Sequence, residues 1–313
     1  QLELFARRVR RQAHPEALKE LRLIVAHLIE RNYRSEIDPS LAFSDQVLEL
    51  VRLFRTRLIA LVAHWMRVGY CQGNFNSDNC AAGGYTLDYG PFGFCERFDP
   101  GFQPWTGGGE HFSFFNQPLA AGANYQMFWS ALRPLLEGNT EALAQLDPIR
   151  DGFAAAMNQE LEAMWARKLG LAVPDAALVN ELLELMLRSQ ADYTILFRRL
   201  CDLPEQASAL QAAFYQPSSE QLDTQWQSWL QRWRDQINAN GNLSETSAAM
   251  KRVNPAVTWR EWLIAPAYEQ AAQGDTSLIK ELQAVFSHPY EEPSAELAAT
   301  YDRLKPREFF NAG

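Results

Sequence analysis

Residues 65–94 read WMRVGYCQGNFNSDNCAAGGYTLDYGPFGF, and this stretch decides the fold. It holds Asp78-Asn79, then a glycine-containing turn, an expected strand from Tyr85 to Leu87, and Asp88. Because the two ends of such a hairpin-like unit meet, we expect the two carboxylates and the amide oxygen to lie close together. Oxygen ligands without His or Cys suit a hard cation such as Mg²⁺. The alternative is purely local turn chemistry, since Asn, Asp, Ser and Gly dominate turns.

A long amphipathic helix is predicted just before this stretch, from a Ser44 N-cap to a terminal Gly69. A helix that leads into an Asp-Asn loop and then an Asp-x-Gly turn is typical of kinase-like phosphotransfer sites. In those sites one Asp orients the attacking hydroxyl, while the Asn and the second Asp hold the metal. We therefore expect a mainly α fold, a protein kinase-like C-lobe with a short β-hairpin catalytic segment.

The rest of the chain reads as helix, with one irregular catalytic segment at residues 70–118. Trp226, Trp229 and Trp233 share one helical face and are expected to be core residues. The polar segment 238–248 is predicted to be a flexible connection. We expect residues 1–240 to form the helical lobe and residues 241–313 a helical extension packed on it. The predicted helices span about 15–32, 124–137, 149–169, 175–188, 191–201, 218–237, 258–272 and 275–286.

Composition limits the classes of partner. The 313 residues are 47% hydrophobic and carry a formal net charge of −9, which argues against a nucleic-acid-binding protein. The four cysteines form no CxxC pair, so we expect reduced thiols. No apolar run reaches the ~18 residues that span a membrane, and no targeting segment is recognised. These features predict a protein of the cytoplasm or of an organelle such as a mitochondrion or plastid, and we expect a monomer.

The sequence also resembles a known family, the selenoprotein O family. The residues that carry the resemblance are the runs 65–70, 76–79 and 86–94, of which Asp-Tyr-Gly-Pro-Phe-Gly-Phe is the most specific. Further matching runs are 98–102, 114–118, 253–255, 271–275 and 289–290, so the resemblance spans most of the chain. Two departures stand out: Gln72 replaces the family's usual His, and no cysteine follows Cys201.

The resemblance implies a pseudokinase-type fold that transfers AMP from ATP to Ser, Thr or Tyr hydroxyls of proteins. It implies that Asp78 is the proton acceptor, and that Asn79 and Asp88 are ligands of Mg²⁺ (or Mn²⁺). Asp88 would also lie against the nucleotide phosphates. The family's N-lobe, with its glycine-rich strands, is expected to be missing from this chain. The alternative is a catalytically inactive kinase-like domain that serves as a scaffold or interaction module.

Overall fold

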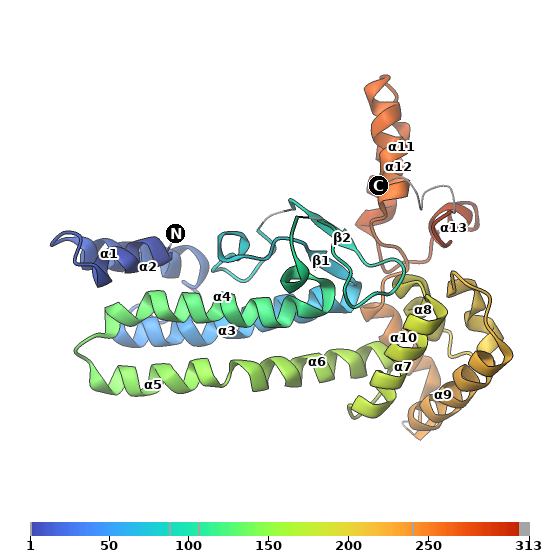
Figure 1. Ribbon diagram of the computed structural model, residues 1–313, viewed down its shortest axis with the longest axis horizontal. Helices are drawn as coiled ribbons and strands as arrows, with labels where there is room; N and C mark the ends of the chain where they lie inside the picture. Colours follow the sequence, from blue (N-terminus) through green and yellow to red (C-terminus); the bar gives the residue numbers. More distant parts are fainter. Residues whose placement is uncertain (1, 88, 106, 240, 307–313) are drawn as a thin grey trace.

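The computed structural model describes residues 2–87, 89–105, 107–239 and 241–306, and it is mainly helical, as predicted (Figure 1). Two short strands are present, β1 (Tyr70–Gln72) and β2 (Phe92–Phe94). The helices are α1 (Leu2–Arg10), α2 (Ala17–Asn32), α3 (Phe43–Val68), α4 (Gln117–Leu132), α5 (Thr140–Asp151), α6 (Phe153–Leu169), α7 (Ala176–Ser189), α8 (Tyr193–Leu200), α9 (Glu220–Ala239), α10 (Leu243–Val253), α11 (Glu261–Ala272), α12 (Ser277–Ser287) and α13 (Ala295–Tyr301).

Helix α3 is the centre of the fold. It lies against α4 and along α5 and α6, while α1 and α2 pack near the end of α3 that is remote from the sheet (Figure 1). Its apolar residues recur every three or four positions, and Val51, Phe54 and Leu58 are at most 1% exposed. The helix therefore delivers its C-terminal end, and the sheet that follows, onto a packed helical layer.

The predicted end of α3 is confirmed, but its predicted N-cap is wrong. Gly69 adopts the left-handed conformation (φ 79°), and its N–H bonds back to the carbonyls of the last turn. The helix begins at Phe43, one residue before Ser44, after an extended Ala42 that makes no side-chain capping bond. Asp45 in the first turn instead complements the helix dipole.

The predicted strand from Tyr85 to Leu87 is also wrong. Only Thr86 pairs there, in an isolated antiparallel bridge with Cys80. The two-stranded sheet joins β1 to β2, with Cys71 opposite Gly93. The sheet thus forms outside the predicted hairpin and brackets the whole stretch that contains Asp78.

Several predicted boundaries shift because caps and glycines lie where periodicity does not show them. The helix expected at 124–137 begins at Gln117, with Pro118 in its first turn, and continues past Leu132 as a short 3₁₀ segment. The helix expected at 149–169 is two helices, α5 and α6, separated at Gly152.

The second half of the chain packs through tryptophans. Trp226, Trp229 and Trp233 of α9 are fully buried, which confirms them as core residues. Each indole N–H donates a hydrogen bond, the last of them to the Leu169 carbonyl at 2.8 Å. The prediction of a flexible segment at 238–248 is wrong in its second part, because Asn242 caps α10 and accepts from the Glu245 N–H.

A smaller apolar cluster joins α11, α12 and α13 around Trp262, Ile264 and Tyr301. In Figure 1 these helices stand beside the sheet, on the side away from α1 and α2. Of the helices that the structure describes, none combines the length and the apolar character that crossing a membrane requires.

Candidate functional site

Strand β1 leads from α3 into the irregular segment that is predicted to be catalytic. The ladder with β2 continues one step further, where the Gly73 N–H donates to the Pro91 carbonyl at 2.7 Å. A Cβ on Gly73 would lie 2.6 Å from that carbonyl oxygen, so a larger residue cannot keep this approach. Residue 73 is therefore glycine because two backbones meet there.

The loop after Gly73 folds on its own amide side chains. The Oδ1 atom of Asn76 accepts from the N–H groups of Asp78 (2.9 Å) and Asn79 (3.3 Å) and so caps a 3₁₀ turn over Ser77–Asn79. The Nδ2 atom of Asn79 donates to the Asn74 carbonyl at 2.8 Å. This bond fixes the Asn79 amide group and directs its donor side into the loop.

The acceptor atoms of this turn remain available. In the described part of the chain, no hydrogen bond reaches Asn79 Oδ1 or the Asp78 carboxylate, and the Asp78 side chain is exposed. An amide oxygen and a carboxylate fit the oxygen ligands that Mg²⁺ takes in proteins. Residues 2–87, 89–105, 107–239 and 241–306 contain no group of three His, Cys, Asp or Glu side chains suited to a metal. A cation at this turn therefore needs a ligand beyond Asp78 and Asn79.

Asp88, the third predicted site residue, lies outside the described residues. The structure brings Asp78 and Asn79 together on one turn, while the convergence of all three side chains stays a prediction. The bridge between Cys80 and Thr86 is antiparallel, so Asn79, just before Cys80, and Leu87, just after Thr86, lie on the same side of the bridge.

Side chains of α3 hold the segment between Cys80 and Thr86. The indole N–H of Trp65 donates to the Thr86 hydroxyl at 2.9 Å. The guanidinium of Arg57 donates to the Gly83 carbonyl at 3.1 Å and also pairs with Glu36. These contacts explain why this part of the chain follows α3 and does not form the predicted strand.

Two amides of α4 reach β1 and the start of the loop that follows it, and the sequence reasoning missed their role. Gln117 bonds to the backbone of β1, and Asn124 bonds to the Phe75 carbonyl at 2.9 Å. Both side chains are buried: Gln117 is 0% exposed and Asn124 is 7% exposed. The available signal was their spacing of seven residues, which places two amides on one face of a helix.

Gln72, the departure from the family's usual His, is buried in β1. Its Oε1 atom accepts from the Tyr70 hydroxyl at 2.6 Å. Only 1% of Gln72 is exposed, so it supports the loop from within and does not reach solvent.

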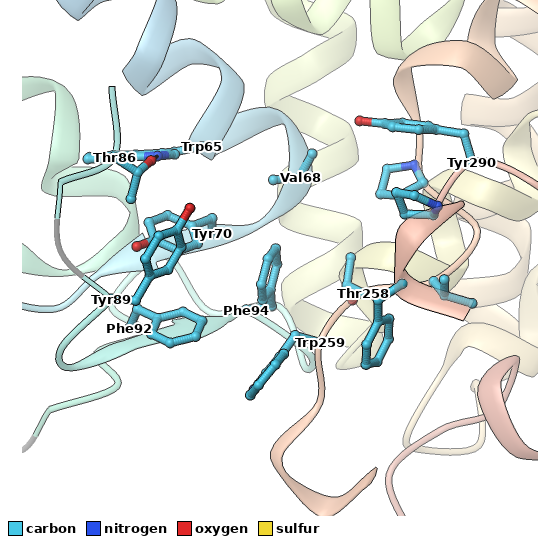
Figure 2. A pocket seen from close by; sticks show the side chains of 14 residues that line it. Trp65, Val68, Tyr70, Thr86, Tyr89, Phe92, Phe94, Thr258, Trp259 and Tyr290 are labelled. Atoms are coloured by element: carbon cyan, nitrogen blue, oxygen red, sulfur yellow. Dashed lines mark hydrogen bonds between the residues drawn. The ribbon is translucent and has the colours of Figure 1, made fainter. Parts of the chain in front are cut away.

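An aromatic cavity of about 430 Å³ lies between residues of the 65–94 stretch and residues of the 255–259 and 286–290 stretches. Figure 2 shows Tyr70, Tyr89 and Phe92 on one side and Trp259 and Tyr290 toward the other. Among the described residues that line it, none is charged. The cavity thus suits an apolar or aromatic group, while phosphates and a cation are better served by the exposed turn at Asp78.

A buried ion network fixes the exit of β2. The Arg260 guanidinium donates two hydrogen bonds to Asp192, at 2.7 and 3.0 Å, and a third to Glu96 at 2.9 Å. Burial opposes the charged form, but Asp192 and Glu96 outweigh it and raise the pKa of Arg260. Glu96 comes two residues after β2, so the network ties the end of the sheet to Asp192, the N-cap of α8, and to Arg260, the residue that precedes α11.

The thiols near the site are not activated. Burial raises the pKa of both Cys71 and Cys80 to about 12. All four cysteines are free in the structure. Because the thiolate is the nucleophilic form, these residues are unsuited to covalent catalysis at neutral pH.

Comparisons with known proteins give one consistent result. The family model described as "Protein adenylyltransferase SelO" matches residues 7–287. A "Protein nucleotidyltransferase YdiU" of Azoarcus sp. (strain BH72) is 34% identical over 261 residues, which is 80% of this chain and 49% of that protein. A protein of the same name from Xanthomonas euvesicatoria pv. vesicatoria (strain 85-10) is 36% identical over 246 residues, 75% of this chain and 47% of that protein. The chain therefore spans about half the length of the curated relatives it matches.

Proposed function

Because the chain belongs to the SelO family of protein nucleotidyltransferases, we propose that it is the metal-binding lobe of an enzyme that transfers AMP from ATP to Ser, Thr or Tyr hydroxyls of proteins. In this proposal the fold is a kinase-like C-lobe. The part of the protein that corresponds to the unmatched half of the relatives' length would supply the N-lobe and most of the affinity for the nucleotide.

One observation carries the proposal. Asn79 donates its Nδ2 to the Asn74 carbonyl, which leaves Oδ1 for a cation beside the exposed Asp78. Asn79 and Asp88 would hold Mg²⁺ (or Mn²⁺), and Asp78 would act on the acceptor hydroxyl. The cation, when bound, would neutralise the charge of the nucleotide phosphates.

The chemistry asks little covalent work of the protein. The acceptor hydroxyl oxygen forms a bond to the α-phosphorus of ATP, and the bond from that phosphorus to the β-bridging oxygen breaks and releases pyrophosphate. The hydroxyl proton passes to the Asp78 carboxylate, which is exposed and accepts no hydrogen bond from the part of the chain that the structure describes. The main-chain N–H of Asp78 donates to Asn76 Oδ1, which holds Asp78 in place. Positioning of this kind supplies most of the rate enhancement in phosphoryl-type transfers.

Labelled ATP tests the proposal in the full-length protein. We expect label from α-labelled ATP, and none from γ-labelled ATP, to reach protein substrates. Asp78→Asn should reduce the transfer about 10²–10⁴-fold, the usual contribution of a general base. Asp45→Asn, at an exposed position in the first turn of α3, is the matched control and should keep full transfer.

Transfer that survives Asp78→Asn would overturn the role of Asp78. Label that arrives only from γ-labelled ATP would show ordinary kinase chemistry. A protein that binds partners but transfers neither label would be the catalytically inactive scaffold.

A further inference from the structure

We propose that Gln117 and Asn124 of α4 are positioning residues that hold the catalytic loop from its back through backbone contacts. Neither side chain belongs to the proposed metal site. The catalytic consequence rests on the proposed function, whereas the effect on the loop itself does not.

Gln117 takes the place of a third strand. In β1 and the residues that flank it, the backbone N–H and C=O groups of odd-numbered residues point toward β2. The bonds from the Cys95 N–H to the Gly69 carbonyl and from the Gly73 N–H to the Pro91 carbonyl show this. The even-numbered residues face the other edge. There the Gln117 amide accepts from the Gln72 N–H and donates to the Tyr70 carbonyl, both at 2.9 Å.

Asn124 holds the loop after β1 at Phe75, five residues after Tyr70. It lies seven residues after Gln117, about two helical turns, and its Nδ2 donates to the Phe75 carbonyl at 2.9 Å. The Phe75 ring is 1% exposed and packs edge-on against Trp65 of α3. Phe75 is therefore held through both its backbone and its ring.

The contacts made by α4 end at Phe75, directly before the turn that carries the predicted site residues. Asn76 follows Phe75 directly, and its side chain caps the turn that carries Asp78 and Asn79. A shift of Phe75 thus moves the cap and both predicted site residues together. A displacement of about 1 Å at a catalytic group can cost about 10²-fold in rate.

The chain contains a matched control for Gln117. Gln227 of α9 makes the same pair of bonds, accepting from the Ala207 N–H at 2.8 Å and donating to the Glu205 carbonyl at 2.9 Å. It contacts a 3₁₀ segment far along the chain from the catalytic loop. Gln117→Met and Gln227→Met remove the same kind of interaction from two different places.

Hydrogen exchange and kinetics together test the proposal in the full-length protein. We expect Gln117→Met to speed exchange of the amides in residues 73–79 at least about tenfold, while Gln227→Met leaves them unchanged. In AMP transfer, Gln117→Met should lower kcat about 10²-fold with little change in the KM for ATP. Asn124→Leu, which keeps the branched shape of the side chain but removes its polar atoms, should show the same pattern and provides the test if Gln117→Met does not fold.

Unchanged exchange at residues 73–79 in Asn124→Leu or in folded Gln117→Met would overturn the proposal. So would a kcat that falls equally in Gln227→Met, since that would reflect general destabilisation. If the unmodified protein transfers no AMP, the proposed function fails, but the exchange measurement still decides whether α4 holds the loop.

Discussion

Substituting Arg260 by Met should strongly destabilise the protein. Arg260 is 2% exposed and Asp192 is fully buried, so the change leaves the Asp192 carboxylate in the core without its cation. Removing one partner of a buried ion pair costs about 3–5 kcal/mol. Asp192 keeps two donors, the Ile195 N–H at 3.0 Å and the Tyr215 hydroxyl at 3.1 Å. We therefore expect a loss near the lower end, about 3 kcal/mol in the free energy of unfolding.

Urea unfolding measures this loss, with Arg232→Met as the control. Arg232 pairs with Glu181 on the surface, where their side chains are 50% and 37% exposed, and such pairs contribute about 0–1 kcal/mol. The double variant Arg260→Met/Asp192→Asn removes both charges of this pair, leaves Glu96 charged, and should recover part of the loss. Equal destabilisation by Arg260→Met and Arg232→Met would refute the reasoning that burial makes this network matter.

Three further predictions follow from single side chains. Gly84→Ala should lower the free energy of unfolding by about 1–3 kcal/mol, because residue 84 has φ 74° and a Cβ there would collide with Arg57. Gly138→Ala is the control: residue 138 has φ 90° but open space around it, so its free energy of unfolding should fall by less in the same urea assay. Burial lowers the pKa of Lys168 well below its usual range, so between that pKa and about 10.4 the unfolded chain binds a proton that the folded chain does not. The stability of the native protein relative to Lys168→Met should therefore rise with pH in this window, by up to about 1.4 kcal/mol per pH unit, and a flat difference would show an ordinary pKa. Burial also raises the pKa of Cys71 to about 12, so mass spectrometry should find it unalkylated by iodoacetamide at pH 8 until the protein unfolds, whereas rapid native labelling would contradict this.

The sequence predicted those features whose cause is local. Gly69 ends α3 because a left-handed residue suits glycine, and the spacing of Trp226, Trp229 and Trp233 places them on one buried face. The turn at Asp78 and Asn79 matches the local turn chemistry that the sequence offers as an alternative, since Asn76 caps it from two and three residues away.

Features caused by distant contacts were not predictable in this way. The segment from Tyr85 to Leu87 has strand-like composition, but Trp65 and Arg57 of α3 take up the polar groups around it. Gln117 bonds to backbone groups 45 and 47 residues away, which no local pattern reveals. The sequence around Asn242 predicts a connection because Asn favours turns and N-caps alike, and the structure shows that Asn242 forms an N-cap.

Manganese binding in the full-length protein, followed by electron paramagnetic resonance with ATP present, tests most directly whether Asn79 and Asp88 hold one divalent cation. We predict that Asn79→Ala and Asp88→Ala each weaken Mn²⁺ binding about tenfold or more, while Asn139→Ala, which removes only the cap of α5, leaves it unchanged. Unaltered Mn²⁺ affinity in both site variants would contradict the proposed metal site.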